Sequence, residues 1–180
     1  MSRFLLFGCL VLTTMVVMGQ RGKYNLGRVP TSEELQARDI SVFPTGVGLP
    51  PGEGSAKEGR SIYVARCASC HGDHGEGHGA NPPIAGGLGT LKSDAPRITV
   101  GSYWPYATTV WDYINRAMPY QEPGSLSPQE VYSLTAYLLY LNGIVGDSEV
   151  LNAKSLPKVK MPNRDGFVPD PRPDTRSLSR

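Results

Sequence analysis

Five consecutive residues, Cys67 to His71, constrain this chain more than any other stretch, because they form the pattern C-x-x-C-H. The pattern is typical of c-type haem attachment, in which two thiols add to the vinyl groups of the porphyrin and the histidine binds the iron. A thioredoxin-like motif would sit beside a βαβ pattern, which residues 50–90 do not show. A zinc site would need two more ligands, and the nearby His74 and His78 lie in a Gly-rich loop that favours solvated side chains. We therefore predict one covalently bound haem c.

Residues 1–19 predict export. They combine one positive charge, a short apolar run from Phe4 to Met18 and a small residue at Gly19, which is the pattern of a secretory signal peptide. The run is shorter than the ~20 apolar residues that span a bilayer, so a membrane anchor is disfavoured. We expect a periplasmic chain cleaved near Gly19, which keeps Cys67 and Cys70 for the haem.

Composition limits the domain organisation. The 180 residues suffice for one ordinary domain with extensions, and a formal net charge of +2 gives no sign of a nucleic-acid-binding surface. Proline and glycine gather outside a central segment, which predicts a domain over residues 53–145 between an N-terminal arm over 20–52 and a C-terminal arm over 146–180. The basic excess of the C-terminal arm allows two interpretations, a docking surface for an acidic partner and a solvated tail.

Three helices are expected in the central segment, so the predicted fold class is all-α. The first begins at Ser55, which forms a capping-box pattern with Glu58, and runs into the haem motif. The second covers Tyr106 to Arg116, and the third begins at the capped sequence Ser127-Pro128-Gln129-Glu130. A short helical turn is also expected from Thr31 in the N-terminal arm.

Gly59 lies inside the first expected helix, where a glycine costs ~1 kcal/mol relative to alanine. The close approach of another helix would explain a glycine at this position, and the last helix is the expected partner. Gly143 then offers a stop for that last helix, because glycine commonly follows a helix C-terminus.

The iron needs a sixth ligand unless it binds a substrate. A methionine thioether is the usual choice for an electron carrier, since it raises the reduction potential. Beyond the expected signal peptide, methionine occurs at Met118 and Met161. Met118 lies between the second and third helices, where packing fixes a ligand better than an arm would, so we predict Met118 as the ligand.

Other residues are candidates for the surroundings of the haem. A backbone carbonyl within residues 81–84 can accept a hydrogen bond from the second ring nitrogen of His71. Trp104 and Tyr106 either pack along the haem, with a hydrogen bond to a propionate, or fill the core. Arg97 is either a propionate partner or a surface residue.

The combined pattern resembles class I cytochromes c over roughly residues 53–145. The matching features are Gly59, Tyr63, the C-x-x-C-H motif, Pro83, Met118 with the proline after it, and Tyr137 on the last helix. The resemblance implies that the first and last helices cross at the glycine and the two aromatic residues. It also implies that the carbonyl of Pro83 accepts from His71 and that Met118 completes the iron coordination.

Four stretches further resemble the cytochrome subunit of periplasmic sulfur or sulfite dehydrogenases, the SoxD type, which partners a molybdenum subunit. They are residues 100–119, 123–127, 139–143 and 156–166. The resemblance implies an electron-transfer subunit, not an enzyme by itself, that accepts electrons from a molybdenum-containing sulfite or sulfane-sulfur dehydrogenase. It would pass them to another cytochrome or an oxidase. Residues 161–166 would then face the partner.

Two alternatives stay open on the sequence. The chain could carry electrons for a different dehydrogenase, for example an alcohol dehydrogenase. It could also be a haem enzyme or sensor whose iron binds a small molecule at an open site.

Overall fold

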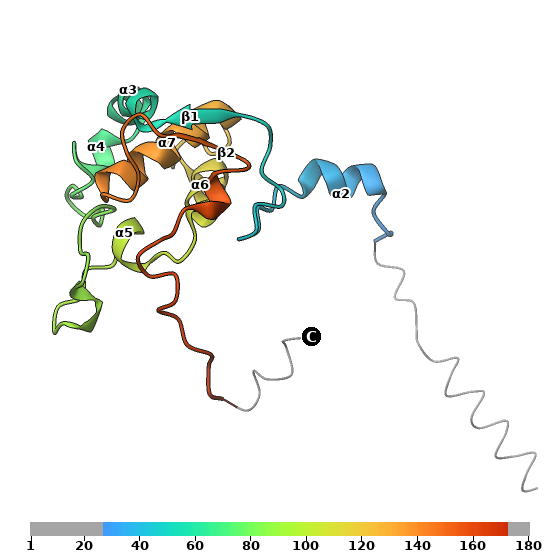
Figure 1. The fold of residues 1–180 in the computed structure, drawn as a ribbon. Helices are drawn as coiled ribbons and strands as arrows, with labels where there is room; N and C mark the ends of the chain where they lie inside the picture. The colour runs from blue at the N-terminus through green and yellow to red at the C-terminus, as the bar shows by residue number, and fades with distance from the viewer. Residues whose placement is uncertain (1–26, 173–180) are drawn as a thin grey trace, which may run out of the picture. The chain divides into compact units, whose positions relative to one another are not determined.

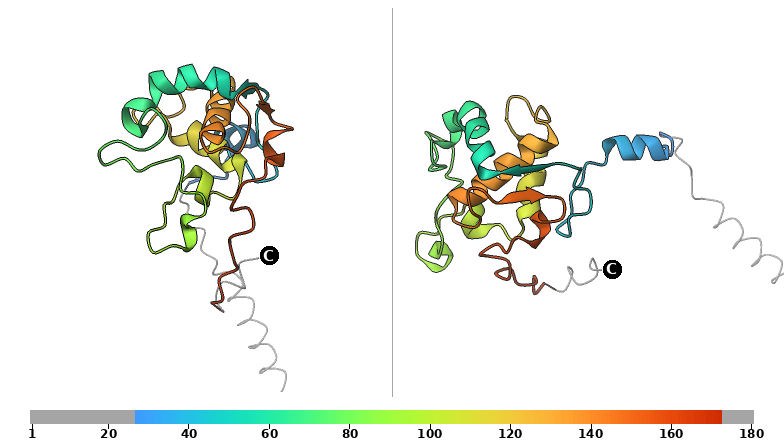
Figure 2. Two further views of the ribbon diagram at one scale, coloured as in Figure 1. Left: turned by 60° about the vertical axis from the view of Figure 1, so that its left-hand side comes forward. Right: turned by 45° about the horizontal axis from the view of Figure 1, so that its top comes forward.

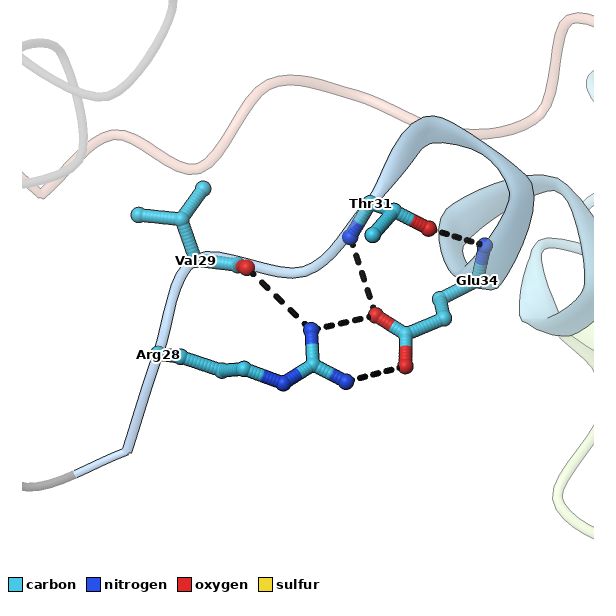
Figure 3. A network of polar contacts seen from close by, with 4 residues as sticks. All are labelled: Arg28, Val29, Thr31 and Glu34. Carbon is cyan, nitrogen blue, oxygen red and sulfur yellow. Dashed lines mark hydrogen bonds and ion pairs between the residues drawn. The ribbon is translucent and has the colours of Figure 1, made fainter.

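The computed structural model describes residues 27–172, and the expected signal peptide lies outside them. The chain divides into two units, one up to Ile40 and one from Ser41 onward. In the first unit, helix α2 (Ser32–Arg38) begins after Thr31, whose hydroxyl accepts from the amide of Glu34 at 3.2 Å, as the sequence predicted. Figure 3 shows the carboxylate of Glu34 accepting in return from the Thr31 amide and from the guanidinium of Arg28.

The second unit is mostly helical (Figure 1). Its helices are α3 (Ala56–Arg66), α4 (Ala68–His71), α5 (Val100–Tyr103), α6 (Ala107–Ala117) and α7 (Pro128–Leu141), with 3-10 turns η1 (Thr90–Lys92) and η2 (Leu156–Lys158). The three expected helices are confirmed, and the hydroxyls of Ser55 and Ser127 cap α3 and α7 in complete capping boxes. Helix α7 ends at Asn142, and Gly143 follows with a positive φ of 68°, as a glycine stop requires.

Helices α3 and α7 pack against each other at glycines (Figure 1). A Cβ atom on Gly59 would lie 2.0 Å from the carbonyl oxygen of Ser133 on α7, so the predicted close approach is confirmed. Gly54 meets the same residue, because its Cβ would lie 2.2 Å from the Ser133 hydroxyl. Beside this contact, the rings of Tyr63 and Tyr137 lie 5.1 Å apart. The close crossing of α3 and α7 therefore requires glycine at these positions, because a side chain there would push the two backbones apart.

Part of the C-terminal segment, expected as an arm, packs in the core of the second unit. Strand β2 (Val150–Asn152) pairs antiparallel with β1 (Glu53–Ser55), just before α3. Leu151, Leu156 and Met161 are at most 1% exposed and pack in the same cluster as the helices. Burial of these apolar side chains outweighs the local irregularity that made the segment look like an arm.

The segment after Met161 is different. From residue 165 to residue 172 every residue is exposed. Phe167 still meets Tyr103 of α5, with ring centroids 5.2 Å apart, and beyond it the chain runs away from the helices (Figures 1 and 2). The partner-facing role expected for residues 161–166 therefore fails at Met161, whose side chain is buried within the chain itself.

Membrane insertion through a helix finds no support in residues 27–172. None of the helices described there has the length and apolar character needed to cross a bilayer.

Candidate functional site

A cavity of about 640 Å³ opens between α3, α4, α6 and α7, within the range of pockets that hold small molecules and cofactors. It brings together all six residues that the sequence indicated for the haem: Cys67, Cys70, His71, Pro83, Trp104 and Met118. Its walls are largely apolar, with Val100, Val110, Ile114, Leu126, Leu134 and Leu138 among them. An apolar pocket with a few polar groups fits a porphyrin, whose ring must leave water while its iron needs ligands.

The attachment side of the cavity comes from the end of α3 and the short helix α4. Cys67 caps both helices, and the amides of Cys70 and His71 donate to its carbonyl at 3.1 and 3.0 Å. The turn thus presents two half-buried thiols and one imidazole to the same cavity. Tyr63 supports this turn, because its hydroxyl donates to the carbonyl of Gly72 at 2.7 Å.

Burial sets the protonation of these groups. Desolvation lowers the pKa of His71, which keeps the imidazole neutral and its nitrogen lone pair available to a metal. Burial also raises the pKa of Cys67 to about 11, although the nearby Arg66 opposes the shift. The unattached Cys67 thiol is therefore protonated at neutral pH, where a thiol is a poor nucleophile.

The Nδ1 atom of His71 is buried and has no hydrogen-bond partner. The expected bond from this ring to a carbonyl of residues 81–84 is thus not formed in the structure, although Pro83 lies in the wall of the same cavity. A buried polar atom without a partner costs free energy, so the Nδ1 atom of His71 needs an acceptor that the structure does not provide. The donor set, with two thiols, an imidazole and a thioether around an apolar cavity, fits a haem.

Asn142 links the end of α7 to Ile84, which lines the cavity, and the sequence did not point to it. The residue is 3% exposed, and its amide nitrogen donates to the carbonyls of Leu138 at 2.9 Å and Ile84 at 3.3 Å. Its amide oxygen accepts from the backbone of Gly86 at 3.0 Å. One side chain thus ties the end of α7 to the segment that follows Pro83. No sequence pattern marks an asparagine at a helix end as such a link.

The two candidate methionine ligands occupy different places. Met118 caps the C-terminus of α6 and lines the cavity. Met161 is 1% exposed in the core cluster and is not part of the cavity wall. The structure therefore places Met118 in the same cavity as His71.

Of the other residues expected near the haem, Trp104 lines the cavity, whereas Tyr106 and Arg97 do not. Trp104 lines the cavity and meets Tyr113 edge-on, with ring centroids 5.6 Å apart. Tyr106 instead holds the guanidinium of Arg164 over its ring at 4.2 Å, and Arg97 is exposed outside the cavity wall. Within residues 27–172, no group of three or more His, Cys, Asp and Glu side chains is placed to hold a metal ion, which disfavours the zinc alternative.

Comparison with known proteins gives three likenesses. The family model for cytochrome c matches residues 56–142. The crystal structure of the sulfane dehydrogenase SoxCD from Paracoccus pantotrophus contains a chain that is 44% identical, with a TM-score of 0.78, and the likeness covers 88% of this chain and 79% of that one. A thiosulfate dehydrogenase from Stutzerimonas stutzeri (strain A1501) is 30% identical over 114 residues, which are 61% of this chain and 33% of that protein.

The present chain therefore spans about a third of the thiosulfate dehydrogenase and most of the SoxCD chain. Both likenesses reach into residues 56–142, because neither 61% nor 88% of this chain fits outside them. The matching family model, the shared fold and the cavity around C-x-x-C-H lead to one conclusion: the chain belongs to the cytochrome c family and carries covalently bound haem c.

Proposed function

We propose that this cytochrome is the exported electron-transfer subunit of a molybdenum-containing dehydrogenase that oxidises sulfite or sulfane sulfur. It would pass the electrons to another cytochrome or an oxidase. The likeness to the SoxCD chain carries the proposal, because 88% of this chain takes part although the family model accounts only for residues 56–142. The shared part therefore extends into the segments outside the haem domain, where a subunit would meet its partner. Export is supported by the pattern of residues 1–19.

Six residues of the cavity have roles in the proposal. Cys67 and Cys70 would hold the haem through thioether bonds, and His71 and Met118 would bind its iron. When bound, haem c supplies a one-electron couple. The apolar walls, with Pro83 and Trp104 among the lining residues, would exclude water from the ring. With two protein ligands on the iron, the chain would transfer electrons and leave substrate chemistry to its partner.

Thiosulfate is a second candidate for the electron source. It is favoured by the 30% identity to the thiosulfate dehydrogenase, whose name states that activity. The support is weaker than for the first proposal, because the likeness covers only 33% of that protein.

A basic strip on the C-terminal segment is the proposed docking surface for the molybdenum subunit. It consists of the exposed residues Lys154, Lys158 and Lys160, which flank the buried Leu156. Among the residues that the structure describes, none forms an ion pair with these three lysines. Unpaired charges on a firmly packed segment suit an acidic partner surface, which they would attract and orient.

Purification from the native host at low salt tests this proposal. The expected result is a complex in which a second protein contains molybdenum, measured by elemental analysis of the purified material. Reversing the strip with Lys154→Glu, Lys158→Glu and Lys160→Glu is expected to remove that protein, because like charges would then face each other.

Lys57→Glu, Arg60→Glu and Lys92→Glu form the matched control, since these exposed residues give the same change in net charge at other places. This control is expected to keep the complex. A wild-type chain that purifies without molybdenum would contradict the proposed function, and equal retention by both triple variants would contradict the docking surface.

A further inference from the structure

The segment that follows Met118 forms one edge of the haem cavity. Residues 118–126 connect α6 to α7, and Met118, Pro119, Tyr120, Gln121 and Leu126 line the cavity. Tyr120 is 80% exposed. Within the loop, two backbone hydrogen bonds are formed: the amide of Glu122 donates to the carbonyl of Pro119 at 2.9 Å, and the amide of Ser125 donates to the carbonyl of Glu122 at 3.2 Å. A loop of this kind needs outside contacts to keep a metal ligand in place.

Arg66 provides such a contact from the other side of the cavity. It is the last residue of α3 and directly precedes Cys67. Its Nη2 atom donates to the carboxylate of Glu122 at 2.9 Å and to the hydroxyl of Ser125 at 2.8 Å. Arg66 also lines the cavity. A single side chain therefore joins the attachment turn to the middle of the methionine loop, 56 and 59 residues away in sequence.

We propose that Arg66 is a positioning residue that holds the loop of residues 119–126 closed and thereby keeps Met118 on the iron. The inference rests on the proposed ligation by Met118. We call the contact of Arg66 with Glu122 and Ser125 the clamp. Because Arg66 directly precedes Cys67, the clamp holds the loop close to the point where the haem is attached. An arginine suits this role, since one guanidinium nitrogen can donate to two acceptors while the charge strengthens both bonds.

The clamp opposes a local motion. When the loop swings outward, Met118 leaves the iron and an external ligand can take its place. The side chains of Arg66 and Glu122 are 35% and 66% exposed, so water screens the pair and its effect is moderate. Loss of the clamp is therefore expected to change the rate of loop opening more than the global stability of the fold.

Imidazole binding to the oxidised full-length holoprotein measures this opening. At high imidazole concentration the binding rate reaches a plateau, which equals the rate at which Met118 leaves the iron. Arg66→Ala is expected to raise the plateau rate by about threefold or more, the range for a charge-assisted contact at a partly exposed site. Glu122→Ala with Ser125→Ala removes the same contact from the other end and is expected to give a similar increase without altering a residue beside the haem cysteines.

Arg60→Ala is the matched control, because Arg60 is exposed on the same helix and forms no ion pair with any residue described in the structure. It is expected to leave the plateau rate unchanged. Arg66→Ala combined with Glu122→Ala and Ser125→Ala should add little to either change alone, since both remove one interaction. Equal plateau rates in the Arg66→Ala and Arg60→Ala proteins would overturn the clamp, as would an effect of Arg66→Ala that the loop variants do not share.

Imidazole binding by a Met118→Ala variant shows whether the ligand assignment or only the clamp is wrong. If Met118 is not the ligand, Met118→Ala leaves imidazole binding as it is in the wild type, and the clamp falls together with the assignment. If Met118→Ala binds imidazole fast while Arg66→Ala behaves like the wild type, the ligand assignment stands and only the clamp is wrong.

Discussion

Replacing Met118 with alanine is expected to lower the reduction potential of the haem by more than about 0.1 V, within the ~0.8 V range that axial ligands span. Methionine favours reduced iron, so its loss favours the oxidised state. The vacated position should also admit carbon monoxide to the reduced protein, because Met118 lines the cavity and its truncation leaves the iron without that protein ligand. Potentiometric titration and the absorption spectrum with and without carbon monoxide measure both effects.

Met161→Ala is the matched control, because it makes the same methionine-to-alanine change outside the cavity. Met161 is 1% exposed in the core and lies outside the cavity, so its truncation should lower the free energy of unfolding by about 2–5 kcal/mol while the potential stays close to that of the wild type. The assignment of Met118 would be wrong if its variant kept the wild-type spectrum, or if the spectrum changed in the Met161 variant instead.

Gly59→Ala is expected to lower the free energy of unfolding by about 3 kcal/mol or more, although alanine favours helices over glycine by ~1 kcal/mol. The new Cβ would lie 2.0 Å from the carbonyl oxygen and 2.6 Å from the carbonyl carbon of Ser133. These are backbone atoms of α7, so no side-chain rotation relieves the clash and the two helices must separate. Urea unfolding followed by circular dichroism measures the loss.

Gly146→Ala is the control for this substitution. A Cβ at Gly146 would meet nothing within 4 Å, and its φ lies outside the left-handed region. Its effect should stay within about 0.5 kcal/mol, as for most surface substitutions. Equal stability of the two variants would show that the crossing of α3 and α7 tolerates a side chain, contrary to the present account.

The features that were predictable from the sequence are those with local rules. The capping residues Ser55 and Ser127 predicted the starts of α3 and α7. Gly59 predicted the contact between these helices, because a glycine inside a helix is destabilising unless another element approaches closely. The C-x-x-C-H spacing predicted the haem-attachment turn at residues 67–71. The sequence predicted Met118 over Met161 as the ligand from its place between two helices; Met118 lines the cavity, and the ligation stays a prediction.

The features that were not predictable depend on contacts between distant segments. Residues around Leu151 and Met161 look irregular and basic, yet they complete the core because β2 pairs with β1 about a hundred residues earlier. Asn142 and Arg66 are ordinary helix-end residues in the sequence. Their roles follow only from the positions of Ile84, Gly86 and Glu122, which a single sequence does not place in space.

The proposed transfer of electrons from a molybdenum-containing dehydrogenase of sulfur compounds to this cytochrome is tested most directly with purified components. The purified chain, the molybdenum subunit and sulfite or a sulfane-sulfur substrate are mixed without oxygen, and the haem absorption is followed. The haem is expected to become reduced when all three are present and to stay oxidised when the molybdenum subunit is left out. A haem that stays oxidised while the molybdenum subunit oxidises the same substrate with an artificial acceptor would contradict the proposed transfer.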